Sequence, residues 1–187
     1  LEMHPGDVVL TPGGSWHGHG SEGEQDCYWI DVLDVPLVQL LEPMFIEMHP
    51  EAFETDYERP PTSPFVFPWR ETAQKLSTTA PSDNGFDGRC IELVAESMPT
   101  FRMTMHGYDA GTQTEPQQTT ANHIYSVVQG SGSTTVDDVP FSWSEGDIIA
   151  VPAWRRHIHE VASDAVLFRV SDEKAQRALG FYREARR

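Results

Sequence analysis

Short stretches of alternating apolar and polar residues recur through the second half of the chain, separated by glycine, proline or aspartate. This pattern is typical of β-strands joined by turns. It predicts strands over residues 89–95, 100–106, 123–129, 132–136, 158–161 and 165–170. Many short strands at this spacing indicate an all-β barrel or sandwich.

Three other segments have helical patterns. Apolar residues within 34–49 predict a short helix, and the proline at the start of residues 68–77 is expected to begin another. At the C-terminus, Ser171 or Asp172 can cap a helix whose apolar residues follow at helical spacing. Residues 78–88 are rich in Ser, Thr, Asp, Asn and Gly, and predict a loop that leads into the strands.

One motif occurs twice, 140 residues apart, over residues 6–19 and 146–159. Gly-Asp opens each copy, a proline follows a buried apolar run, and two histidines close it at identical offsets: His17 and His19, then His157 and His159. An internal duplication explains five matched positions better than chance does. Predicted strands precede only the second copy, so we expect the first to be the end of an incomplete barrel.

Charge and composition exclude several classes of partner. The 187 residues carry a formal net charge of -16 and are 39% hydrophobic, which argues against binding to nucleic acid or to an anionic membrane. The sequence contains no apolar run of membrane-spanning length, so we expect a soluble, cytoplasmic protein. Only Lys75 and Lys174 are lysines, and such acid-rich composition favours a halophilic source. Cys27 and Cys90 are expected to be reduced and buried, without a function.

The first copy of the motif reads Gly-x5-Pro-x-Gly-x2-His from Gly6 to His17, and resembles the second signature motif of the cupin barrel. Residues 16–20, 29–36, 147–157 and 178–184 resemble one family among the cupins, the gentisate 1,2-dioxygenases. Salicylate and 1-hydroxy-2-naphthoate dioxygenases are close relatives of that family. The similarity extends over almost all of the chain.

The resemblance implies a bicupin, a homo-oligomer that is usually a tetramer, with non-haem Fe(II) in its N-terminal barrel. Such enzymes open the ring of a hydroxylated aromatic acid with O₂, and gentisate would give maleylpyruvate. Three histidines hold the iron in the family, and His17 matches one of them. His19 matches a histidine that hydrogen-bonds substrate and moves protons, and Asp31 matches an acidic residue that can orient a histidine.

The sequence departs from the family in both barrels. The His-x-His pair that completes the iron site would lie upstream of Leu1, so we expect the 187 residues alone to be inactive. In the second barrel, Gln117, Gln118 and Thr119 hold the places of the corresponding pair. That barrel is therefore expected to be metal-free and structural, with His157 and His159 kept as hydrogen-bonded relics.

These observations predict an all-β fold built from cupin barrels, the first incomplete and the second complete. Residues 1–50 are expected to form the C-terminal part of the first barrel, 51–88 a linker with a short helix, 89–171 the second barrel, and 172–187 a C-terminal helix.

Simpler interpretations remain beside these. His17 can be a buried histidine in a turn, His19 a surface histidine, and Asp31 an ordinary aspartate at a strand end. Trp16, Trp29 and Trp154 are expected to line or pack the barrels. Two other functions stay open: a metal-free cupin that binds a small molecule without turning it over, and a structural or assembly role.

Overall fold

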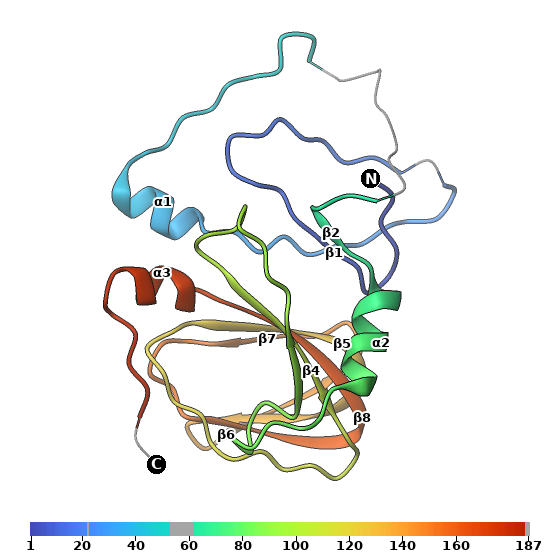
Figure 1. The fold of residues 1–187 in the computed structure, drawn as a ribbon, viewed down its shortest axis with the longest axis vertical. Helices are drawn as coiled ribbons and strands as arrows, with labels where there is room; N and C mark the ends of the chain where they lie inside the picture. The colour runs from blue at the N-terminus through green and yellow to red at the C-terminus, as the bar shows by residue number, and fades with distance from the viewer. Residues whose placement is uncertain (22, 53–61, 186–187) are drawn as a thin grey trace.

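The body of the molecule is an antiparallel sheet of six strands. A computed structural model describes residues 1–21, 23–52 and 62–185. The strands run in the order β3-β4-β8-β5-β6, and β7 also pairs with β5 (Figure 1). Their bounds are β3 Arg89–Glu92, β4 Arg102–Tyr108, β5 His123–Val136, β6 Val139–Ser144, β7 Ile148–Val151 and β8 His157–Ser171. This composition confirms the predicted all-β class.

Two long strands, β5 and β8, pair along their whole length, with His123 opposite Ser171 and Val136 opposite His157. The sequence predicted a break in each of them, because glycine or aspartate interrupts both apolar patterns. The structure keeps each strand continuous and absorbs the extra residues in register shifts between Val127 and Gly132. Gly130 has a φ of +89° there, which explains why a turn-forming residue lies inside a strand.

A helix is present in each of the three predicted segments, although the C-terminal one ends at Ala178 and does not extend through Tyr182 as expected. The helices are α1 Val35–Leu41, α2 Trp69–Thr78 and α3 Glu173–Ala178. The first turn of α2 is held from the motif segment, because the backbone N–H of Trp69 donates to Asp7 Oδ1 at 2.7 Å. Asp172 precedes α3 but makes no side-chain cap, since its carboxylate accepts two hydrogen bonds from Asn122 instead.

The N-terminal segment is joined to the sheet by a short second ladder. β1 Val8–Val9 pairs with β2 Val66–Phe67, immediately before α2. Leu10 is buried in a cluster that also contains Leu76 of α2 and Met105 of β4. The rest of the N-terminal segment and α1 extend over one end of the strands (Figure 1). The motif around His17 therefore starts from a fixed point on the sheet.

A second buried cluster lies between β5, β6, β7 and β8, with Tyr125, Trp143 and Leu167 among its members. The division of the chain at residues 50, 88 and 171 remains a prediction, and part of the predicted linker, residues 53–61, lies outside the described residues. Among the residues that are described, no helix has the length and apolar character needed to cross a membrane.

Candidate functional site

The two histidines of the first motif lie side by side on the exposed segment that follows β1. The ring centroids of His17 and His19 are 5.6 Å apart, and His19 stacks on Trp29 at 5.2 Å. His17 Nδ1 lies 3.2 Å from the carbonyl oxygen of Ser15. A carbonyl can only accept, so the ring donates from Nδ1, and a neutral His17 presents the lone pair of Nε2. This is the tautomer that a histidine needs in order to bind a metal through Nε2.

Asp31 is not brought to this pair by any contact. It is exposed, and no hydrogen bond or ion pair reaches it within the described residues. The three tryptophans expected to line or pack the barrels are also about half exposed: Trp16 at 54%, Trp29 at 52% and Trp154 at 47%. The aromatic side chains buried among the strands are instead those of Phe86, Tyr108, Tyr125 and Trp143.

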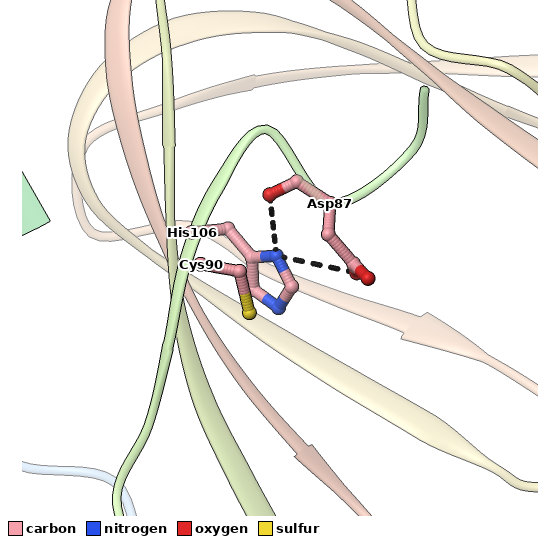
Figure 2. A group of neighbouring side chains, drawn as sticks. All are labelled: Asp87, Cys90 and His106. Atoms are coloured by element: carbon pink, nitrogen blue, oxygen red, sulfur yellow. Dashed lines mark hydrogen bonds and ion pairs between the residues drawn. The ribbon is translucent and has the colours of Figure 1, made fainter. Parts of the chain in front are cut away.

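One group of side chains has the spacing of a metal site. Ligand atoms of Asp87, Cys90 and His106 lie within 4.8 Å of one another (Figure 2). Both ring nitrogens of His106 are already used, because Nδ1 donates to the Asp87 carbonyl at 2.9 Å and Nε2 pairs with Thr104 Oγ1 at 2.8 Å. Burial raises the pKa of the Cys90 thiol to about 11, so the thiol stays protonated at neutral pH.

Arg169 decides against a cation in this group. Its Nη1 lies 3.4 Å from Asp87 Oδ1, and the side chain is only 2% exposed. A divalent cation would therefore share its carboxylate with a buried guanidinium and require a thiolate beside it. The three residues do not fit a Fe(II) centre.

Arg169 is the middle of a larger polar interior, which we define as the buried side chains of Arg169, His106, His123, His157 and His159. Arg169 Nε donates to Thr104 Oγ1 at 3.1 Å. The Tyr125 hydroxyl is hydrogen-bonded to His157 Nε2 at 2.9 Å, Thr134 to His159 Nδ1 at 2.8 Å, and Thr119 to His123 Nε2 at 3.0 Å.

The four histidines of the polar interior are neutral. Burial lowers the pKa of His157 to about 4 and moves the pKa values of His106, His123 and His159 well below the ordinary value, with nearby Arg169 lowering them further. Burial also opposes the charge of Arg169, but Tyr125 and Asp87 more than offset it and raise its pKa. The interior thus holds one fixed positive charge among neutral rings.

His157 and His159 were expected to be satisfied by hydrogen bonds, and each is satisfied at one nitrogen only. Three ring nitrogens are buried without a hydrogen-bond partner: His123 Nδ1, His157 Nδ1 and His159 Nε2. Buried polar atoms without a partner are costly, so their presence calls for an explanation.

Sequence reasoning missed Asp87, His106 and Arg169. A signal existed for Arg169, because it interrupts an otherwise apolar strand; Asp87 lies in a segment that reads as an ordinary loop. The expectation of two buried cysteines is also corrected: Cys27 is exposed and Cys90 partly buried, and both are free.

Comparisons with known proteins place this geometry in context. No protein-family model matches the chain. A 5-aminosalicylate 1,2-dioxygenase of a Comamonas species is 32% identical over 98% of this chain and 57% of its own length. A gentisate 1,2-dioxygenase of Aquipseudomonas alcaligenes is 29% identical over 98% of this chain and 61% of its own length. The chain thus spans about three-fifths of these relatives.

The fold also matches a solved structure. A variant of salicylate 1,2-dioxygenase from Pseudoaminobacter salicylatoxidans, in complex with gentisate, superposes with a TM-score of 0.89 at 26% identity. The match covers 99% of this chain and 61% of that one. The strands and the N-terminal segment therefore occur together in a larger protein of known structure.

Proposed function

Because the chain belongs to the gentisate 1,2-dioxygenase family, we propose that the whole protein is a dioxygenase that opens the ring of a hydroxylated aromatic acid with O₂. Gentisate is the substrate we propose, with maleylpyruvate as the product. The observation that carries the proposal is the first motif, in which His17 presents Nε2 next to His19.

His17 would be one of the ligands of a non-haem Fe(II). Its Nδ1–H is fixed on the Ser15 carbonyl, so Nε2 is available without a change of tautomer. When bound, Fe(II) would supply a Lewis-acid centre at which the hydroxyl and carboxylate of the substrate meet O₂. One imidazole is not an iron site, and within the described residues His17 belongs to no group of three potential ligands. We propose that histidines from chain beyond these 187 residues complete it, which makes the isolated 187 residues inactive.

His19 would act on the substrate rather than on the metal. The His19 ring stacks on Trp29, with 5.2 Å between the ring centroids, and this contact orients it next to His17. A histidine held there can hydrogen-bond a substrate oxygen and accept or return its proton. Asp31 follows His17 by fourteen residues and His19 by twelve. It makes no contact of its own with either ring, and we propose that it orients one of them once the site is complete.

The exposed apolar residues of the N-terminal segment support a larger assembly. Tyr28 is 91% exposed, Phe45 79% and Ile46 86%, which leaves a large apolar surface uncovered. We propose that the rest of a first cupin barrel, a neighbouring subunit of a homo-oligomer, or both cover it. Residues 1–50 would then be the end of that barrel and residues 89–171 a second one, joined by 51–88 and followed by the helix in 172–187. From the resemblance to gentisate 1,2-dioxygenases we propose that the homo-oligomer is a tetramer. We also propose that the protein is cytoplasmic.

A second candidate function is a metal-free cupin that binds a small molecule or supports assembly. The polar interior favours it for the strands β3–β8, because a guanidinium and neutral histidines occupy the space there. The two functions are compatible if each belongs to a different barrel.

Oxygen uptake by the intact, Fe(II)-loaded protein tests the proposal. We expect uptake with gentisate and formation of a ring-opened product, and none with benzoate, which has a carboxylate but no ring hydroxyl. Gentisate and salicylate compared in the same assay decide the substrate. Iron-loaded protein that consumes no oxygen with any hydroxylated aromatic acid would contradict the proposed activity.

A further inference from the structure

A short loop between α2 and β3, residues 82–88, closes one end of the polar interior. The backbone N–H of Ser82 donates to the Gly88 carbonyl at 2.7 Å, and Asn84 Oδ1 accepts from the backbone of both Phe86 and Asp87 at 2.9 Å. Gly85 pairs with the backbone N–H of Glu115 at 2.8 Å. The loop is therefore fixed at both ends and folded inward at its tip.

Phe86, at the tip of the loop, packs against two of the histidines that have an unpartnered ring nitrogen, His157 and His159. Its side chain is 1% exposed. Its ring centroid lies 5.1 Å from His157 in an edge-on arrangement and 5.3 Å from His159. The Tyr108 hydroxyl donates to the Phe86 carbonyl at 3.0 Å and holds the tip in place. An aromatic ring thus occupies the surroundings of two of the three unpartnered ring nitrogens.

Asp87 places a carboxylate beside the buried guanidinium, and the fit is loose. Asp87 Oδ1 lies 3.4 Å from Arg169 Nη1 but makes no hydrogen bond, and it is one of the buried atoms without a partner. A well-formed carboxylate–guanidinium pair has two short, parallel hydrogen bonds. The position of Asp87 therefore neutralises Arg169 without satisfying it.

Together, Phe86 and Asp87 put an aromatic ring against His157 and His159 and a carboxylate toward Arg169. We propose that the polar interior is a binding site for an aromatic carboxylic acid, and that the loop of residues 82–88 occupies it in place of that ligand. The three unpartnered histidine nitrogens are the polar groups that such a ligand, through ring hydroxyls or amino groups, would satisfy. This site is separate from His17 and needs no metal.

The loop competes with a free acid because it is tethered at the site. Ligand can bind only to the fraction of molecules in which the loop is displaced, and the apparent affinity falls by that fraction. The wild-type chain is therefore expected to bind an aromatic acid weakly. Removing the ring of Phe86 takes away the competing group and leaves Arg169 and the histidines in place.

Titration of the 187-residue chain with benzoate, without added metal, tests the site. We expect Phe86→Ala to bind benzoate at least about tenfold more tightly than the wild type, and to prefer it over benzamide, the uncharged isostere. Phe101→Ala is the matched control, since Phe101 is also buried but lies in the apolar cluster with Leu10 and Leu76 and has no ring contact with His157 or His159. The double variant His17→Ala, Phe86→Ala should keep the benzoate affinity, which separates this site from the proposed iron site.

Equal binding of benzoate and benzamide, or equal binding to the Phe86 and Phe101 variants, would overturn the proposal, because either result describes a cavity that accepts any ring. Absence of benzoate binding by folded Phe86→Ala would overturn it too. Asp87→Asn provides a test that leaves the apolar packing intact. It should also bind benzoate more tightly than the wild type, because Arg169 loses its internal counter-charge, and an unchanged affinity would contradict the inference.

Discussion

Acidification should destabilise the fold of the six-stranded sheet through the buried histidines of the polar interior. His106, His123, His157 and His159 are neutral in the folded protein, with pKa values below the ordinary 6.5. In the unfolded chain each regains its ordinary pKa, so the unfolded state binds more protons once the pH falls below 6.5. Stability from these groups is complete above that pH and is lost as the pH falls toward the folded pKa values.

The magnitude follows from the shifts. With a folded pKa of about 4, His157 alone should remove about 2 kcal/mol from the free energy of unfolding between pH 7 and pH 5. The pKa values of His106, His123 and His159 are also lowered well below the ordinary value by burial, so their protonation destabilises the folded state in the same direction. The loss from His157 alone is already a large fraction of the roughly 5–15 kcal/mol that is typical for a domain.

Urea unfolding followed by far-UV circular dichroism at pH 7, 6 and 5, at constant ionic strength, measures this loss. His157→Gln is the control variant, because glutamine can keep a hydrogen bond to Tyr125 but does not titrate; its stability should fall less steeply with pH than that of the wild type. An unfolding free energy that is the same at pH 7 and pH 5 would refute the reasoning.

Two further predictions concern packing and charge. Gly132→Ala should destabilise the fold by about 1–3 kcal/mol in urea unfolding, because a Cβ there would overlap the Glu160 carbonyl and the Trp143 ring. Gly20 has open space around it, so Gly20→Ala should change the unfolding free energy little. Equal effects of the two substitutions would contradict the close packing described around Gly132. With a net charge of -16, the chain should also gain thermal stability as salt is raised, and a melting temperature independent of salt would count against a surface adapted to high ionic strength.

The sequence predicts the elements of this fold well where local chemistry sets them. Pro68 at the start of α2 and the glycine and proline turns between strands act within a few residues of the chain. Local sequence signals do not predict that β5 and β8 are each one continuous strand. Glycines that resemble a turn are accommodated in bulges because the two strands pair over their whole length.

The polar interior was hidden for a related reason. Phe86 and Asp87 lie in a segment with loop composition, and their importance comes from Arg169 and His157, which are more than 70 residues away in the chain. A local pattern cannot show that a loop folds inward onto a distant strand. His17 and His19, by contrast, were identified from a motif, and the structure adds the tautomer of one and the stacking of the other.

Bound iron in matched variants of the intact protein tests the central claim most directly. Iron content and gentisate-dependent oxygen uptake are measured together for the wild type, His17→Ala and His157→Gln. If His17 is an iron ligand, His17→Ala loses both iron and oxygen uptake, while His157→Gln keeps both. Equal losses in the two variants, or full iron content in His17→Ala, would contradict the assignment of His17 to the iron site.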